Sequence, residues 1–269
     1  MMSYESDEQP APLCTYAALA AMVAVFAAEY TRTDLSALEP FSWRLGQGET
    51  WRLITPTFLH GSVLHILFNA ILFFHFSRVL ENWLGPWIVL VLYAFLGAAS
   101  NAAEVLVSGR PVVENGMVYI APGLVEGASG VVYGFFGFLW AVRLRRSEVE
   151  AAVTPYLIEA MLGWLAVCAV LSYFNVPIAN MAHASGLAVG WLLGRAVAWR
   201  SPWRWAVGAA GVLLGGMLIA CTYGPVWHAT LGHIPACRRW YDPDDPGPVF
   251  RNQYEHPQTL NPPGVFGMP

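Results

Sequence analysis

The sequence contains no lysine and few charged residues of any kind. All 14 of its basic residues are arginine, and charged residues make up 12% of the 269 positions, about half the share in soluble domains. The hydrophobic share is 56% and the mean hydropathy is +0.47, which favours a membrane protein over an ordinary soluble domain. We therefore expect the lipid bilayer as its surroundings and no nucleic-acid partner. Arginine without lysine in an alanine-rich chain indicates a GC-rich, bacterial genome.

Cysteine is also scarce, since four residues are too few for a disulfide framework. Three of them lie in apolar segments, where we expect small core residues: Cys14, Cys168 and Cys221. Cys237 lies outside these segments, near His228 and His233, which are residue types that bind zinc. No fourth ligand is evident and histidines in a tail are usually solvated, so we expect no metal and no cofactor.

Long apolar segments make up most of the sequence. A membrane-spanning helix needs about 20 mostly apolar residues, and seven stretches qualify, of which the fourth is short and rich in glycine. They are residues 12–29, 57–79, 86–107, 126–142, 156–174, 180–199 and 203–222. The sequence therefore predicts an all-α polytopic membrane protein, with no internal repeat and no separate soluble domain.

Arginine placement predicts the orientation, because cytoplasmic connections carry more positive charge. With a cytoplasmic N-terminus, seven arginines fall on inner connections and four on outer ones. The inner set is Arg78, Arg143, Arg145, Arg146, Arg195, Arg200 and Arg204, and the outer set is Arg32, Arg44, Arg52 and Arg110. We expect a multi-pass protein of a bacterial inner membrane, with the N-terminus inside and the C-terminus outside.

Two stretches outside the apolar segments differ in character. Residues 30–56 contain several leucines and tryptophans, so we expect this first outer loop to lie in the membrane interface. Residues 223–269 hold nine of the 19 prolines and are expected to be extended or irregular.

Polar side chains inside membrane segments are costly and mark functional sites. In the second segment, HILFNAILFF, His65 and Asn69 are four residues apart and share one helix face. In the fourth, Tyr133 follows Ser129 at the same spacing. Ser129 lies in the first turn, where free N–H groups and the helix dipole suit a developing oxyanion. His65 and Asn69 can add side-chain donors to it.

Small residues recur at helical spacing along two segments. The sixth segment carries His183, Gly186, Gly190 and Gly194 on one stripe, and the fourth carries Gly130, Gly134 and Gly137. Such stripes let two membrane helices approach closely. If these two stripes face each other, Ser129 and His183 meet as a nucleophile and its base.

Several motifs, taken together and in this order, resemble the rhomboid family of intramembrane serine proteases. They are GASG around Ser129, AHASGLAVG around His183, HILFN around His65 and Asn69, WR at Trp51 and Arg52, and LE at Leu80 and Glu81. The resemblance covers about residues 12–200. It implies a six-helix core with a Ser–His dyad and no acidic third member. It also implies hydrolysis of transmembrane helices of single-span proteins near the outer membrane face.

On this resemblance, Ser129 is the nucleophile and His183 the general base. His65, Asn69 and the Ser129 N–H are the oxyanion donors, and Tyr133 packs against the His183 ring. The expected supporting residues are Gly127, Gly130, Gly186 and Gly190. The last apolar segment resembles the additional helix of six-plus-one family members. The expected regions are an N-terminal tail at 1–11, the six-helix core at 12–200, the extra helix at 201–222 and the tail at 223–269.

One residue departs from the family pattern: Glu126, three positions before the nucleophile. One interpretation is a carboxylate facing outer water, favoured by the start of the helix. The alternative is that it tunes His183 or restricts substrate entry.

Four further ionisable residues are given no part in the chemistry. We expect Glu104 to be hydrogen-bonded packing, and Glu81 to anchor the cytoplasmic side by pairing with arginine. His75 is interpreted as structural, and His60 as an interfacial residue with no assigned role.

Two competing functions remain beside the protease. One is a catalytically inert relative that binds transmembrane helices as a chaperone or escort. The intact set of Ser129, His183, His65 and Asn69 argues against it, because inert members usually lose part of that set. The other is a transporter or channel, which has no inverted repeat to support it. The sequence predicts no particular oligomeric state.

Overall fold

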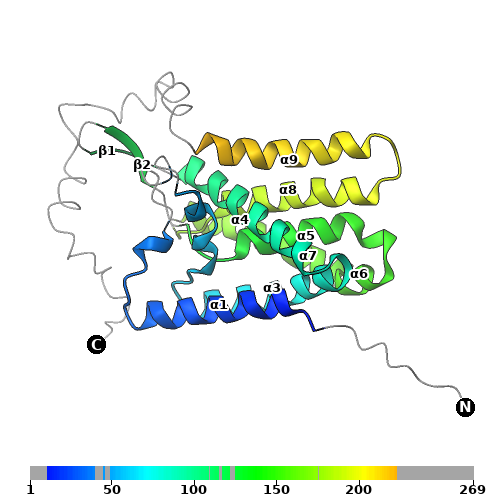
Figure 1. Ribbon diagram of the computed structural model, residues 1–269, viewed down its shortest axis with the longest axis horizontal. Coiled ribbons are helices and arrows are strands. Elements are labelled where there is room, and N and C mark those ends of the chain that lie inside the picture. The colour runs from blue at the N-terminus through cyan, green and yellow to red at the C-terminus, as the bar shows by residue number, and fades with distance from the viewer. Residues whose placement is uncertain are drawn as a thin grey trace, which may run out of the picture.

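The protein is a bundle of helices that run along one long axis (Figure 1). The computed structural model describes residues 11–39, 45, 49–108, 110–114, 117–121, 125–174 and 176–222. The predictions for the N-terminal tail, the tail at 223–269 and the histidines and cysteine within it lie outside these residues.

Seven long helices form the described bundle, one for each predicted apolar segment. They are α1 (Leu13–Tyr30), α3 (Val63–Leu84), α4 (Pro86–Ser108), α5 (Ser129–Val142), α7 (Pro155–Tyr173), α8 (Asn180–Ala198) and α9 (Arg204–Cys221). The predicted all-α polytopic class is confirmed.

Short elements connect these helices. They are η1 (Ser36–Leu38), η2 (Thr50–Leu53), η3 (Thr55–Phe58), η4 (Arg143–Arg145) and α6 (Ser147–Ala152). An antiparallel hairpin of β1 (Arg110–Glu114) and β2 (Met117–Ala121), with Arg110 opposite Ala121, lies between α4 and α5. This hairpin was not predicted from the sequence.

The second helix begins later than expected. The predicted segment was 57–79, whereas α3 starts at Val63, because the Ser62 hydroxyl accepts a hydrogen bond from the His65 N–H at 3.2 Å and caps the helix. The residues from Thr50 to Phe58 form 3₁₀ turns instead. The helix ends before Gly85, whose φ of +82° suits a residue without a side chain.

Two of the seven helices differ from the rest in length or in composition. Five are long and apolar enough to cross a membrane, namely α1, α3, α4, α7 and α9. Helix α5 has only 14 residues, and α8 carries Asn180, His183 and Arg195. In α5, every residue from Gly130 to Leu139 is buried. A helix that is enclosed by other helices does not face lipid along its length. It therefore depends on small side chains that allow close packing more than on a long apolar surface.

The glycine stripes of α5 and α8 face each other. A Cβ atom at Gly186 would collide with the carbonyl oxygen of Gly130, and one at Gly190 would collide with that of Gly134. Gly194 meets the Phe138 carbonyl in the same way. These neighbours are backbone atoms, which cannot move aside as a flexible side chain can, so the close approach requires glycine.

Glu81 anchors α3 to the start of α1. Its carboxylate accepts hydrogen bonds from the N–H groups of Cys14 and Thr15, each at 2.8 Å, and from the Thr15 hydroxyl at 2.7 Å. The expected anchoring role therefore holds, but the partners are the free N–H groups of a helix start rather than an arginine.

The contact between the glycine stripes of α5 and α8 predicts the effect of adding one methyl group at Gly190. Gly190→Ala should lower the thermal unfolding midpoint in detergent, with an overpacking cost of about 1–3 kcal/mol. The matched control is Gly163→Ala in α7, where a Cβ atom meets nothing within 4 Å. Equal midpoints for the two variants would mean that α5 and α8 are not in backbone contact at this position.

Candidate active site

Ser129 and His183 are in hydrogen-bond contact. The Ser129 hydroxyl oxygen lies 2.8 Å from His183 Nε2. Ser129 is the first residue of α5, and His183 lies in the first turn of α8 and is only 6% exposed. The two helix starts thus bring a hydroxyl and an imidazole together inside an apolar bundle, as the facing stripes predict.

Tyr133 and Glu104 support this pair from two sides. The Tyr133 ring lies 4.9 Å from the His183 ring, tilted by 31°, and its hydroxyl donates to the Met161 carbonyl at 2.9 Å. The Glu104 carboxylate accepts from the N–H groups of Met181 and Ala182 at 2.9 and 3.1 Å. Glu104 therefore caps α8, which agrees with the expected hydrogen-bonded packing role.

The second ring nitrogen of His183 has no acidic partner in the described part of the chain. Its Nδ1 is buried without a hydrogen-bond partner among those residues. A proton on Nδ1 leaves Nε2 free to accept one from the serine, which is the tautomer a general base needs.

His65 and Asn69 reach the segment just before Ser129. Gly127 has a φ of +95°, and a Cβ atom there would lie 2.5 Å from His65 Nε2 and 3.7 Å from Asn69 Nδ2. Glycine is required at this position both for its backbone conformation and for the space taken by the His65 ring. Asn69 Nδ2 also donates to the His65 carbonyl at 2.9 Å, which uses one of its two hydrogens.

His60 holds the same segment in place. Its Nδ1 donates to the Phe58 carbonyl at 3.1 Å, and its Nε2 accepts from the Ala128 N–H at 3.4 Å. The Gly127 N–H donates to the Pro56 carbonyl at 3.0 Å. Sequence reasoning missed this role, because a lone histidine in a loop gives no sign of a partner 68 residues away.

The charge state of His60 follows from these contacts. Burial, and secondly the neighbouring His65, lowers the pKa of His60 from its ordinary 6.5 to about 4. The ring is therefore neutral at pH 7, which its two opposite roles, one donor and one acceptor, also require.

Glu126 contacts His65. One carboxylate oxygen lies 3.5 Å from His65 Nδ1 and accepts from the Gly61 N–H at 3.3 Å. The hydrogen bond with His65 is the main reason that the pKa of Glu126 lies below its ordinary value. The Glu126 side chain is 23% exposed and also contacts His65. It is therefore partly open to water, as the first interpretation expects, and at the same time lies beside the candidate site.

Comparison with known proteins identifies the family. A family model described as the Rhomboid domain matches residues 47–200. The chain belongs to the rhomboid family. It is 33% identical over 149 residues to YdcA of Bacillus subtilis (strain 168), which carries a provisional rhomboid-protease name, and this match covers 55% of this chain and 68% of that protein.

Rhomboid protease GlpG of Yersinia pestis (strain Pestoides F) is 28% identical over 191 residues, which cover 69% of this chain and 62% of GlpG. GlpG of Yersinia pseudotuberculosis serotype O:3 (strain YPIII) gives the same figures. The predicted enzyme class, a rhomboid-type serine protease, agrees with the names of these relatives.

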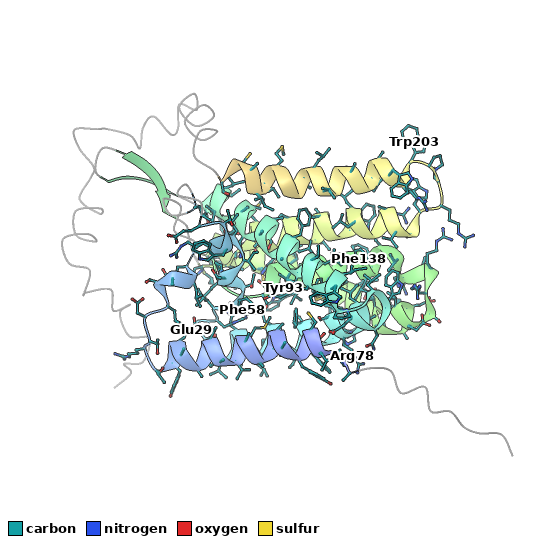
Figure 2. The ribbon with its side chains drawn as sticks, viewed as in Figure 1. Glu29, Phe58, Arg78, Tyr93, Phe138 and Trp203 are labelled. Atoms are coloured by element: carbon teal, nitrogen blue, oxygen red, sulfur yellow. The ribbon has the colours of Figure 1, made fainter. Side chains whose placement is uncertain are left out.

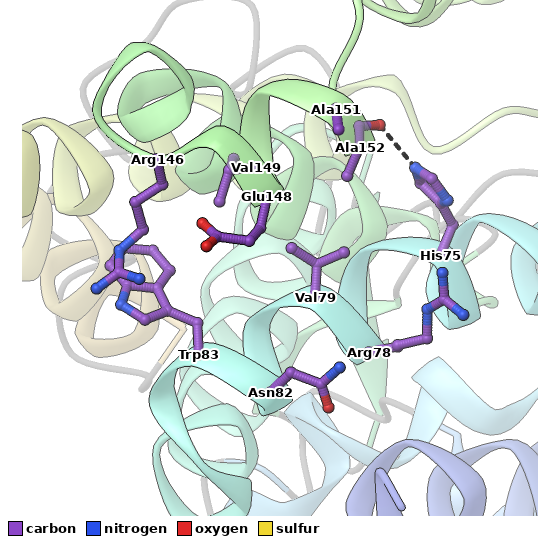
Figure 3. A pocket seen from close by; sticks show the side chains of 10 residues that line it. All are labelled: His75, Arg78, Val79, Asn82, Trp83, Arg146, Glu148, Val149, Ala151 and Ala152. Carbon is purple, nitrogen blue, oxygen red and sulfur yellow. Dashed lines mark hydrogen bonds between the residues drawn. The ribbon is translucent and has the colours of Figure 1, made fainter. Parts of the chain in front are cut away.

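The end of the bundle opposite the candidate site holds a cavity of about 540 Å³, lined by charged, aromatic and aliphatic side chains. Figure 3 shows His75 at its edge, where the ring nitrogen Nε2 lies 2.8 Å from the Ala152 carbonyl. Arg146 stacks over Trp83 at 4.4 Å in the same cavity. Figure 2 shows Arg78 at this end and Glu29 at the other. His75 therefore lies apart from the Ser129–His183 pair and contacts the Ala152 carbonyl instead.

The low pKa of His60 predicts a loss of stability in acid. Between pH 6.5 and about 4 the unfolded chain binds a proton that the folded chain does not, so stability rises with pH across this window and is lost as pH falls. The full loss of unfolding free energy is about 3 kcal/mol. It is followed as a fall in the melting midpoint of the protein in detergent.

A His60→Gln variant isolates this contribution. Its amide can accept from the Ala128 N–H but does not titrate in this window. The melting midpoint of the variant should therefore fall less steeply below pH 6.5 than that of the wild type. The same slope in both proteins would remove His60 as the cause.

Proposed function

We propose that this rhomboid-family chain is an intramembrane serine endopeptidase that cuts transmembrane segments near the outer membrane face. The observation that supports this most is the 2.8 Å contact between the Ser129 hydroxyl and His183 Nε2. A buried hydroxyl in contact with a buried imidazole has the geometry of a nucleophile and its general base. An inert helix-binding escort would not need this contact, and no observation favours that alternative.

The chemistry begins with proton transfer. His183 Nε2 accepts the proton of the Ser129 hydroxyl as the oxygen attacks the carbonyl carbon of the substrate. The carbonyl oxygen becomes negative, and the imidazolium then donates its proton to the leaving amine. Water then attacks the carbonyl carbon of the acyl group while His183 Nε2 accepts its proton, and the bond to the Ser129 oxygen breaks as that oxygen takes the proton back from the imidazolium. The Tyr133 ring keeps the imidazole facing the hydroxyl throughout.

The oxyanion is stabilised beside Gly127. The Ser129 N–H belongs to the first turn of α5, whose N–H groups have no partner inside the helix. His65 and Asn69 reach the same side of the segment from α3. One donor of this kind is typically worth about 2.7–4 kcal/mol, or roughly 10²–10³-fold in rate.

The substrate is proposed to be a single-span membrane protein. A backbone that is already hydrogen-bonded in a helix cannot present a carbonyl group to Ser129. Preferred substrates therefore contain glycine, proline or polar residues near the outer end of the span, with a small residue before the cut. We also propose a bacterial inner membrane, because the chain is rich in alanine and has arginine but no lysine. The N-terminus is proposed to be cytoplasmic, because Arg78, Arg143 and Arg195 then lie on inner connections.

Removing the nucleophile tests the function. Ser129→Ala and His183→Ala should each abolish cleavage of single-span substrates, and Ser129→Ala should also lose labelling by a fluorophosphonate probe. Cleavage is measured on purified protein in detergent or liposomes, with a uniform polyleucine span as the poor-substrate control. Substantial cleavage by Ser129→Ala would overturn the proposal. Equal cleavage of the polyleucine span would overturn the substrate preference alone.

The oxyanion donors are tested by a double variant. Asn69→Ala or His65→Ala alone should lower kcat by at most about 10²-fold, because the remaining donors substitute in part. The double variant should be much worse than either, with a smaller change in KM, since the charge exists mainly in the transition state. Rates are normalised to folded enzyme by active-site titration. A near-normal kcat in the double variant would exclude both residues from the mechanism.

A further inference from the structure

The cavity at the end of the bundle away from Ser129 and His183 takes no part in the proposed chemistry. Its volume of about 540 Å³ lies within the range of roughly 300–1,000 Å³ that is usual for ligand pockets. The cavity lies between the second half of α3 and the short helix α6, and Figure 3 shows the side chains that line it. Since these two segments are far apart in sequence, the cavity forms only when the bundle is assembled.

Three charged side chains line this cavity, namely Arg78, Arg146 and Glu148. Among the residues that the structure describes, no hydrogen bond or ion pair engages the charged group of any of the three. The neighbouring Arg143 and Glu150, in contrast, pair with each other at 3.9 Å. Charged groups of both signs therefore face one cavity with their polar atoms available to a ligand.

Apolar side chains complete the cavity and hold one of its charges in place. The Arg146 guanidinium lies 4.4 Å from the centre of the Trp83 ring, and Val79 and Val149 line the same cavity. A guanidinium that stacks on an aromatic face keeps the N–H groups of its edge free to bind an oxyanion such as phosphate. Because the stacking already restricts Arg146, less conformational freedom is lost when those N–H groups bind.

The position of the cavity indicates which ligand is at hand. Helix α3 is long and apolar enough to cross a membrane, and Arg78 and Trp83 lie in its last two turns. Charged and aromatic residues at the end of a spanning helix lie among lipid headgroups rather than among acyl chains. In the proposed orientation this is the cytoplasmic side, where basic pockets between helices bind phospholipid headgroups.

We propose that this cavity binds the headgroup of a phospholipid that carries both a phosphodiester and a primary amine. The phosphate accepts hydrogen bonds from the stacked Arg146, Arg78 adds a second positive charge, and the ammonium group donates to the Glu148 carboxylate. A headgroup that has phosphate alone would place a like charge beside Glu148, whereas a zwitterion complements both signs. The inference goes beyond the proposed protease function, because the cavity lies at the other end of the bundle.

Three headgroups test the inference on the purified full-length protein in detergent. Binding of short-chain phosphatidylethanolamine, phosphatidylglycerol and phosphatidylcholine is measured by native mass spectrometry and by the rise in the melting midpoint. Phosphatidylglycerol has no amine, and the methylated amine of phosphatidylcholine has no N–H to donate. We expect the ethanolamine lipid to bind on the order of fivefold more tightly than either, the size of one partly exposed ion pair. Equal binding of the three lipids would overturn the inference.

Two variants assign the preference to its residues. Arg146→Gln should weaken binding of all three lipids on the order of fivefold, since each of them carries a phosphate. Glu148→Gln should remove only the preference for the amine, so that the ethanolamine and glycerol lipids bind alike. The matched controls are Arg145→Gln and Glu150→Gln, which make the same charge changes in the same part of the chain but outside the cavity lining.

The controls should bind all three lipids as the wild type does. Losses in the controls equal to those in Arg146→Gln and Glu148→Gln would show that surface charge in general is responsible, and would overturn the inference. The comparison of headgroups on the wild type decides the matter even if a variant does not fold.

A last measurement separates a lipid from a soluble ligand with the same chemistry. Glycerophosphoethanolamine carries the same phosphodiester and amine without acyl chains. It should bind far more weakly than the short-chain ethanolamine lipid, because acyl chains add apolar contact with the bundle. Equal affinity of the two compounds would identify a soluble phosphate ester as the ligand and would overturn the assignment to a lipid.

Discussion

The backbone contact between α5 and α8 is the constraint on which the rest of the structure depends. Three glycines of α8, Gly186, Gly190 and Gly194, each abut a carbonyl oxygen of α5, and no side chain fits between them. The rise of a helix is about 1.5 Å per residue, so a slip of one residue along either axis would break the 2.8 Å contact of Ser129 with His183. Packing at the glycines therefore sets the geometry of the candidate site.

Helix starts are the second constraint, because lipid cannot satisfy the free N–H groups there. The bundle meets it with carboxylates from other helices: Glu81 of α3 caps α1, and Glu104 of α4 caps α8. The second cap has a consequence for function. Since Glu104 holds Met181 and Ala182, it also holds the turn that carries His183.

The candidate oxyanion region is assembled from segments that are distant in sequence. The residues just before Ser129 are tied to Pro56 and His60, and Gly127 adopts a left-handed conformation that admits the His65 ring. In this arrangement two histidines have different tasks. Burial keeps His60 neutral, and its hydrogen bonds hold the segment before Ser129 in place, whereas His65 is proposed as a donor to the oxyanion beside Gly127.

Apolar runs in the sequence located all seven helices. For α1, α3, α4, α7 and α9 the reason is that crossing a bilayer requires a long apolar run whatever the neighbours are, whereas α5 and α8 were recognised as segments also by their glycine stripes. The spacing of glycines was sufficient to pair α5 with α8, because stripes of small residues have few other uses. The start of α3, the hairpin of β1 and β2, and the partners of His60, Glu81 and Glu126 could not be predicted from the sequence. Each of these contacts depends on how separate elements meet in space, and a buried polar atom bonds to whichever partner the packing brings within reach.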